Sequence, residues 1–288
     1  NAMGIVGVLL DVTEMNQMKE KVLLQNKELK EALHIIQTDL EAAAKAQRSL
    51  LPSPRLRIPA VTAAWHFEPC SAVGGDLLNI LPLDDSHVGF YVLDVAGHGV
   101  QAALLSVTLS RLLTKWRAGE NLLVTSSGEI RSPEEVVNLL NIRFQIEPEN
   151  SQYFTILYGI LDTKNATVSY ASAGHQPALA CLPDGTTQVW LEGDKPVGWR
   201  LEERFTCYTK EFPPGSRLFL FSDGLIEAFN PERTAIFGRE RIEQLIKETR
   251  LSKLKDAVQS IVASAQTWSD RSEPEDDVTV LAIEYTKP

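Results

Sequence analysis

The chain has 288 residues, of which 44 % are hydrophobic and 23 % charged, as in an ordinary globular protein. Its formal net charge of −10 disfavours nucleic acid or an anionic membrane as a partner. No apolar run approaches the roughly 20 residues that a membrane-spanning helix needs. The three scattered cysteines suit reduced thiols in a cytoplasmic protein, and none begins a Cys-x5-Arg loop, so cysteine-based phosphatase chemistry is not indicated.

Residues 1–14 have the pattern of a domain end. Asn1-Ala2-Met3 has the form of an expression scar. Residues 4–10 read as one apolar strand, and Asp11 or Thr13 would cap the helix that follows. Because one strand cannot fold alone, we expect the terminal strand of a truncated domain. The segment resembles the last strand and the Asp-Val-Thr-Glu exit motif of PAS sensor domains.

Residues 15–51 contain neither Gly nor Pro and predict a helix of about 37 residues, roughly 55 Å long. Its apolar residues follow heptads whose phase shifts by a stutter-like step at Leu29. The heptads that follow this shift carry Leu33, Ile36 and Leu40, and they continue past Gln47 to Leu50. A helix packed along its own domain is the alternative, but one narrow apolar stripe favours a parallel coiled coil. We therefore expect a homodimer through residues 15–51.

Residues 52–288 have the pattern of an α+β domain. Apolar alternation and turn residues predict strands at 61–68, 76–83, 87–94, 153–161, 167–173, 178–182, 187–191, 204–211, 217–221 and 278–285. Helices are expected at 100–117, 225–229, 239–249 and 253–268, and Ser132 with Pro133 marks the start of another. Because the strands come in runs, two packed antiparallel β-sheets flanked by helices fit better than a βαβ parallel sheet.

Acidic residues lie at four places where a hydrophobic strand meets a tight turn. They are Asp76, Asp94, Asp223 and the pair Asp276-Asp277. A carboxylate at the end of a buried strand is costly to desolvate without a partner. One such Asp is commonly a turn or helix cap. Four of them, each beside glycine or another carboxylate, favour convergence on hard cations bound through oxygen and indicate a metal-dependent hydrolase.

With these turns placed, the chain resembles the bacterial PPM-type (type 2C) serine/threonine phosphatases of the RsbU/SpoIIE branch. The resemblance covers residues 45–288, and its motifs occur in the expected order. The matching segments are Gln-Arg-Ser-Leu-Leu-Pro at 47–52, Gly-Gly-Asp at 74–76, Asp-Val-Ala-Gly-His-Gly at 94–99, Ala-Gly-His-Gln-Pro at 173–177, Phe-Ser-Asp-Gly-Leu-Ile-Glu-Ala at 221–228 and Asp-Asp-Val-Thr at 276–279.

The resemblance implies a centre of two divalent cations, Mn²⁺ or Mg²⁺. Asp94 would bridge the ions, and Asp223 with Asp276 would complete the shell of one of them. Asp76 and the backbone carbonyl of Val95 would complete the shell of the other. A water made acidic by both ions would attack phosphorus in line, so no side chain is assigned as the catalytic group. Carboxylates this close would raise one another's pKa, and two cations remove that conflict.

Four further positions in these motifs carry other expectations. His98 lies two positions beyond the slot of the general acid in eukaryotic type 2C enzymes, which Ala96 occupies here, so we interpret it as a turn or helix-start residue. His175 is interpreted mainly as structural. Asn79 replaces the commoner second aspartate of the Gly-Gly-Asp-x-x-Asp motif, which disfavours a third metal there. Asp277 is expected to support the ligands rather than bind an ion.

The sequence therefore predicts a metal-dependent serine/threonine phosphatase with a cytoplasmic signalling role. The expected substrate is a phosphoserine or phosphothreonine on a partner such as a STAS-domain anti-anti-sigma factor. Two alternatives stay open: a catalytically inactive binding module that retains the fold, and a dimeric signalling scaffold whose helix matters more than its turnover.

Overall fold

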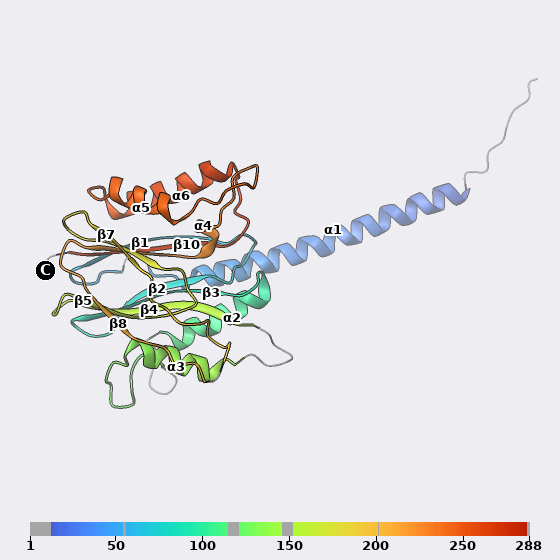
Figure 1. Cartoon of the computed structure of the whole chain (residues 1–288). Coiled ribbons are helices and arrows are strands. Elements are labelled where there is room, and N and C mark those ends of the chain that lie inside the picture. The colour runs from blue at the N-terminus through green and yellow to red at the C-terminus, as the bar shows by residue number, and fades with distance from the viewer. Residues whose placement is uncertain (1–12, 54–55, 115–120, 146–151, 201, 287–288) are drawn as a thin grey trace, which may run out of the picture. The chain divides into compact units, whose positions relative to one another are not determined.

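The computed structural model describes residues 13–53, 56–114, 121–145, 152–200 and 202–286 (Figure 1). The chain divides into two compact units, Asn1–Lys45 and Ala46–Pro288, and each is described by itself. The strand expected at residues 4–10 lies outside the described residues. None of the described helices combines the length and the apolarity that crossing a membrane requires.

Helix α1 spans Thr13–Arg48, close to the prediction of 15–51. Neither Gly nor Pro interrupts it, and Pro52 follows the turn in which it ends. Large apolar side chains stay exposed along it, namely Met15, Met18, Val22, Leu23, Leu24, Leu29, Leu33, Ile35 and Ile36. An exposed apolar stripe on a long helix is typical of a helix that binds a partner helix, so the coiled coil stays a prediction with structural support.

The described part of the second unit contains two five-stranded antiparallel sheets, which confirms the predicted fold class. Sheet I has the order β1-β10-β9-β6-β7, formed by Val61–Glu68, Val278–Tyr285, Arg217–Phe221, Ala178–Cys181 and Thr187–Trp190. Sheet II has the order β2-β3-β4-β5-β8, formed by Leu77–Pro82, His87–Val95, Phe154–Asp162, Thr167–Ala173 and Tyr208–Glu211.

Helices cover the outer faces of both sheets, so the second unit has four layers (Figure 1). Helices α2 (Val100–Leu112) and α3 (Pro133–Arg143) pack on sheet II. Helices α5 (Arg239–Glu248) and α6 (Leu254–Ser269) pack on sheet I, and the short α4 (Asp223–Ile226) follows β9 directly. The start of α3 is as predicted, with Pro133 as its first residue and Ser132 in a capping box with Glu135.

Alternate residues of the central strands serve two different cores. In β3, Phe90 and Val92 belong to the core between the two sheets, whereas Tyr91 and Leu93 belong to the core beneath α2 and α3. Successive side chains of a strand point to opposite faces, so a strand covered on both faces must be apolar throughout. This double burial explains the unbroken apolar run that ends at Asp94.

The structure shortens two predicted elements. The strand expected at 204–211 exists only as Tyr208–Glu211 (β8). Upstream of it, the amide of Thr206 donates to Asp194 Oδ2 and Phe205 is buried, so this segment does not extend the ladder with β5. The helix expected at 100–117 ends at Leu112, and residues 115–120 lie outside the described part.

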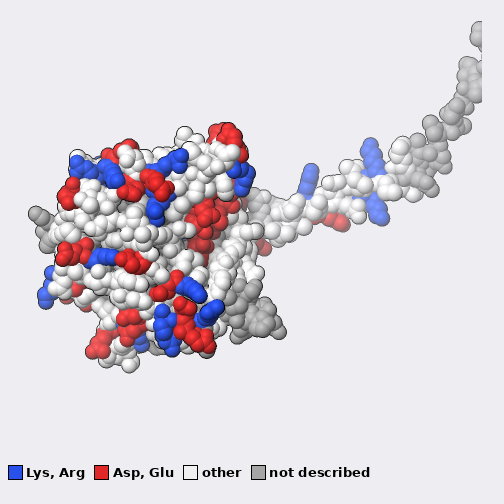
Figure 2. All heavy atoms as spheres, viewed as in Figure 1, with Lys and Arg blue, Asp and Glu red and all other residues white. Residues whose placement is uncertain are grey.

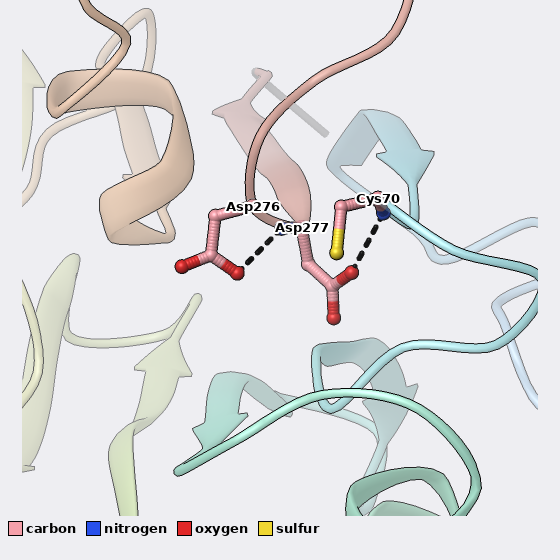
Figure 3. Close-up of side chains that lie close together, drawn as sticks. All are labelled: Cys70, Asp276 and Asp277. Carbon is pink, nitrogen blue, oxygen red and sulfur yellow. Dashed lines mark hydrogen bonds between the residues drawn. The ribbon is translucent and has the colours of Figure 1, made fainter.

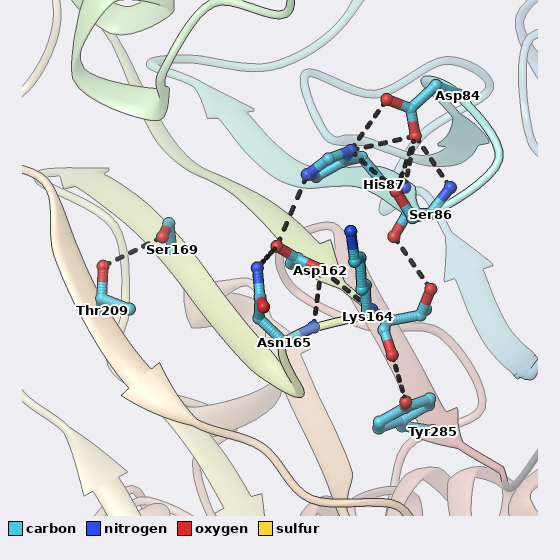
Figure 4. Close-up of polar contacts among 10 residues, drawn as sticks. Asp84, Ser86, His87, Asp162, Lys164, Asn165, Ser169, Thr209 and Tyr285 are labelled. Carbon is cyan, nitrogen blue, oxygen red and sulfur yellow. Dashed lines mark hydrogen bonds and ion pairs between the residues drawn. The ribbon is translucent and has the colours of Figure 1, made fainter.

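Polar contacts tie together two turns of sheet II at the end where β3 begins (Figure 4). The carboxylate of Asp84 accepts hydrogen bonds from the amides of Ser86 and His87. The His87 ring lies between two carboxylates, with Nδ1 2.8 Å from Asp84 Oδ2 and Nε2 3.6 Å from Asp162 Oδ2. These contacts join the β2–β3 turn to the β4–β5 turn and help to keep the four strands β2 to β5 in register.

Candidate metal centre

Asp76 and Asp94 lie side by side at one end of sheet II. Strands β2 and β3 are paired with Leu77 opposite Leu93, so continuing the antiparallel register by one residue places Asp76 opposite Asp94. Asp94 is in phase with Phe90 and Val92, whose side chains enter the core between the sheets. Both carboxylates therefore lie at the mouth of the space between the sheets.

Asp223 and Asp276 are supplied by sheet I. Asp223 is the first residue of α4, directly after Ser222 at the end of β9, and Asp276 precedes β10. Ser222 holds the two segments together, because its Oγ donates to the carbonyl of Asp277 and accepts from the amide of Thr279. The two sheets thus bring Asp76, Asp94, Asp223 and Asp276 to one place, where their charges act on one another.

The pKa values of these carboxyl groups reflect their crowding. Burial, and then the charges of Asp223, Asp276 and Asp277, together raise the pKa of Asp94 to about 7. Burial and the charges of Asp94 and Asp277 raise the pKa of Asp76 well above its usual range. The pKa of Asp223 is raised by burial and by Asp276, and that of Asp276 mainly by burial. The cluster needs protons or cations to be stable.

Asp76 provides the test of whether a cation fits. Its side chain is 1 % exposed, and neither carboxylate oxygen forms a hydrogen bond of normal geometry with a described residue, while the hydroxyl groups of Thr279 and Ser222 lie near enough to lower its pKa against the larger effect of burial. Buried polar atoms are almost always paired, and an unpaired carboxylate is among the most costly to bury. The oxygens around it come from carboxylates and a backbone carbonyl, which is the donor set that Mg²⁺ and Mn²⁺ prefer. The residues therefore fit divalent cations bound through oxygen.

Asp277 joins the two sheets at this centre (Figure 3). Its Oδ2 accepts hydrogen bonds from the amides of Gly75 at 2.6 Å and Asp76 at 3.3 Å. Its Oδ1 accepts from the amide of Cys70 at 2.8 Å. Because the carboxylate is occupied by backbone donors, Asp277 positions the turn that carries Asp76, in agreement with the supporting role expected for it.

Cys70 lies beside this pair. Its sulfur and one carboxylate oxygen each of Asp276 and Asp277 fall within 4.8 Å of one another. Burial, and then the charge of Asp277, raises the pKa of the Cys70 thiol to about 12. The thiol is therefore protonated at neutral pH and is a poor metal ligand, because metals bind the thiolate.

Two glycines allow separate backbone segments to approach one another closely at the centre. A Cβ on Gly75 would lie 2.7 Å from the carbonyl oxygen of Val95, so that carbonyl faces the turn carrying Asp76. A Cβ on Gly224 would clash with the carbonyl oxygen of Asp277. Any side chain at either position would push apart the segments that bear the carboxylates.

The remaining motif residues lie around the centre in different ways. His98 is exposed, and its charge lowers the pKa of Asp276 against the larger effect of burial. His175 is buried and its Nδ1 lies 2.8 Å from Thr155 Oγ1, while Thr155 pairs with Asp94 across β3 and β4. Burial lowers the pKa of His175 to about 4, so it is neutral at pH 7.

Asn79 lies opposite Tyr91, on the face of sheet II turned away from the centre.

Sequence reasoning gave no role to Gln47, which the structure places against the centre. Gln47 is 2 % exposed, and its side-chain amide bonds to both the carbonyl and the amide of Gly74. It also donates to Ser106 Oγ in α2. The sequence did contain a signal for this role, because Gln47 is a polar residue in phase with the apolar stripe that ends at Leu50. A polar residue at such a position is unusual unless its side chain has a specific polar partner.

Acidic side chains gather on the face of the second unit that carries α4, between the two sheet layers (Figure 2). Asp223, Glu227 and Asp276 belong to this part of the molecule, and Glu227 adds its charge to those that raise the pKa of Asp223. A concentration of negative charge of this kind attracts cations and repels a bare phosphate unless cations are bound.

Comparison of the sequence with known proteins points to one family. A family model described as Stage II sporulation protein E (SpoIIE) matches residues 84–286. Phosphoserine phosphatase RsbP of Bacillus subtilis (strain 168) is 24 % identical over 246 residues, which make up 85 % of this chain and 57 % of RsbP. Phosphoserine phosphatase RsbU of the same organism is 24 % identical over 249 residues, 86 % of this chain and 70 % of RsbU. The chain thus spans little more than half the length of RsbP.

The fold is also that of solved phosphatase domains. The SiaA-PP2C domain of Pseudomonas aeruginosa superposes with a TM-score of 0.74, covering 88 % of this chain and 98 % of that domain. The two share 18 % sequence identity, so this likeness concerns the fold. It agrees with the two antiparallel sheets and flanking helices described above.

Proposed function

Because the chain belongs to the SpoIIE family of PP2C-type phosphatases, we propose that it is a metal-dependent serine/threonine protein phosphatase. The observation that carries this proposal is the unpaired, buried carboxylate of Asp76 beside Asp94, in a cluster that also receives Asp223 and Asp276. Such a cluster is unfavourable in an empty site, and a protein with no use for cations would have no reason to keep it.

In this proposal two Mn²⁺ or Mg²⁺ ions are held by oxygen ligands alone. Asp94, whose pKa is affected by Asp76 as well as by Asp223 and Asp276, would be the ligand that both ions share. Asp76 and the carbonyl of Val95 would hold one of them, and Asp223 with Asp276 the other. When bound, the ions would supply an acidified water for in-line attack on phosphorus and neutralise charge on the phosphate.

The chain's own residues would orient this chemistry. Asp277 fixes the Gly75-Asp76 turn through two backbone hydrogen bonds, and Ser222 fixes the segment of Asp276 against Asp223. His175 is neutral and faces Thr155, the cross-strand neighbour of Asp94, so it supports the strand without adding charge. These supports matter because metal ligands displaced by about 1 Å lose much of their effect.

The proposed substrate is a phosphoserine or phosphothreonine on a signalling protein. RsbP and RsbU are both named as phosphoserine phosphatases, which supports a phosphoserine substrate. We extend this to a STAS-domain anti-anti-sigma factor as the partner, on the strength of the family resemblance.

A dimeric signalling scaffold is the second candidate, and the exposed apolar stripe of α1 favours it. Turnover separates the two functions. The phosphatase should hydrolyse p-nitrophenyl phosphate and a phosphoserine peptide when Mn²⁺ or Mg²⁺ is added, and excess EDTA should abolish both reactions. Undiminished turnover in EDTA would refute the metal mechanism, and absence of turnover with either ion would favour the scaffold. Zinc should not support full activity, because the ligands contain neither thiolate nor imidazole.

A further inference from the structure

A cavity of about 190 Å³ lies directly beside the proposed metal centre. Asp276 and Gly224 form its wall on the side of the centre, and the rest is built from α4, α6 and the segment between α6 and β10. Asp276 thus belongs both to the wall of the cavity and to the proposed metal centre. A phosphoprotein bound with its phosphate at that centre would lie next to this cavity.

The floor of the cavity is apolar. Leu225 from α4, Val262 and Ala265 from α6, and Val278 from β10 line it, and each of these side chains is less than 9 % exposed. The rest of their surface packs in the core beneath α5 and α6. The floor is therefore held rigidly and can accept the aliphatic part of a side chain without rearrangement.

The rim of the cavity is acidic. Glu68, Glu227, Glu273 and Glu275 stand around it, together with one cation, Arg271. Glu275 is neutralised by Arg233 at 2.6 Å and Arg271 at 2.7 Å, and Glu68 lies 3.0 Å from His66 Nε2. Within the described part of the chain, Glu227 and Glu273 form no ion pair and are exposed to solvent. Two carboxylates are thus left to meet a cation from outside.

An apolar floor beneath unpaired carboxylates matches one kind of side chain. Arginine and lysine bury an aliphatic stem while their charged end stays at a polar rim. A cavity of this volume holds such a stem, and Glu227 lies next to both the rim and the metal-centre residue Asp223. We propose that this cavity binds an arginine or lysine of the phosphoprotein substrate, close in sequence to the phosphorylated residue. The proposal rests on the phosphatase function proposed above.

The test uses phosphoserine heptapeptides in an alanine background, with arginine placed in turn at each of the six positions around the phosphoserine. Matched peptides carry norleucine, alanine or glutamate at the same position, so that the stem and the charge are varied separately. At the best position we expect arginine to raise kcat/KM about tenfold over alanine, with norleucine between them and glutamate lowest.

Two variants decide whether Glu227 provides the charge. Glu227→Gln should reduce the preference for arginine over norleucine, and Glu227→Lys should invert the order of arginine and glutamate. Glu240→Gln, at an 82 % exposed side chain on α5 outside the cavity, is the matched control and should leave every ratio as in the parent protein. If Glu227 had a merely structural role, its replacement would lower kcat/KM by the same factor for every peptide. That result would overturn the proposal.

The outcomes separate this proposal from the proposed function. If all peptides are hydrolysed at one rate, the proposal that the cavity binds a basic residue is wrong, while the phosphatase function stands. Equal rates for norleucine and arginine would overturn it as well, since the occupant would then be apolar. If Mn²⁺ supports hydrolysis of neither p-nitrophenyl phosphate nor any peptide, the phosphatase function itself fails.

Discussion

The side-chain amide of Gln47 forms two hydrogen bonds with a single residue, Gly74. It donates to the Gly74 carbonyl at 2.7 Å and accepts from the Gly74 amide at 3.2 Å. Gly74 begins the turn that ends in Asp76, and Gln47 lies one residue before the last residue of α1. A displacement of Gln47 would therefore act directly on Gly74, in the turn that carries the proposed metal ligand Asp76.

We predict that Gln47→Leu lowers phosphatase activity by about tenfold or more while the protein stays folded, because residues that position metal ligands are typically worth 10- to 100-fold. Gln47→Glu keeps the acceptor but buries a carboxylate oxygen against the Gly74 carbonyl, so it should lower activity at least as much as Gln47→Leu. The control is Gln37→Leu on the same helix, where the side chain is exposed and bonds only to Glu41 among the described residues. Manganese titrations should show weaker activation for Gln47→Leu, and identical titrations would contradict the link.

Asp94→Asn and Asp223→Asn should each reduce turnover by at least about 100-fold, since each removes a proposed ligand. The melting temperature of the metal-free protein should hold or rise, because each change removes a negative charge from a crowded cluster. Asp256→Asn, at an exposed position on α6, serves as the control. Unfolding of both variants at ambient temperature would mean that these aspartates are structural.

His98→Ala should retain measurable turnover, in contrast to Asp94→Asn. His98 is exposed, and among the described groups its resolved electrostatic effect is on Asp276. Loss of the imidazole beside Asp276 should weaken phosphate binding slightly, which would appear in KM. A loss of kcat as deep as that of Asp94→Asn would instead assign His98 to the proton transfer.

The stability of the metal-free protein should increase as the pH falls from about 7 towards 4. The pKa of Asp94 is about 7 in the folded protein against its ordinary value of 3.8, and that of Asp76 is also raised, so the folded state binds more protons in this range. Urea unfolding at several pH values measures the slope. Saturating Mn²⁺ should flatten it, and metal binding at pH 6 should release protons into the buffer. A slope of opposite sign would show that the carboxylates are not crowded.

The helix α1 should make the protein a parallel dimer, with Leu33, Ile36 and Leu40 on its seam. Replacing Leu33 and Ile36 by lysine should cost several kcal/mol of association free energy, at about 2 kcal/mol for each buried aliphatic side chain. Ile35→Lys is the matched control, because Ile35 is as exposed as its neighbour but lies off the predicted seam. Light scattering measures the mass, and a monomeric parent protein would refute the dimer.

The stutter at Leu29 should make the same helix regulatory. Two competing registers form a bistable element. Inserting or removing four residues near Leu29, or deleting residues 1–45, should therefore change phosphopeptide turnover. If turnover is unchanged in every variant, α1 is a passive tether.

The sequence predicted the sheets better than the connections within the site. The bounds of β1, β5, β9 and β10 match the expected ones, because alternation and turn residues mark both ends of each strand. The strand expected at 204–211 was too long, because a local pattern does not reveal that Asp194 captures the amide of Thr206.

The candidate ligands stand out in the sequence because each lies where an apolar strand meets a turn. Their supports could not be predicted in the same way. Gln47 bonds across 27 residues to Gly74, and the amide of Cys70 bonds across 207 residues to Asp277. Contacts of this range depend on how the two sheets pack, which periodicity along one strand does not encode.

The carboxylates come from both sheets, Asp76 and Asp94 from one and Asp223 and Asp276 from the other. This arrangement has a consequence for how long the protein survives in the cell. Ions bound between them would act as a crosslink across the sandwich, since only the folded state brings the four together. Protein starved of metal would open first at this end and expose β2 and β10 to proteases. The supply of manganese or magnesium would then set how much of the protein survives, in addition to how fast each molecule works.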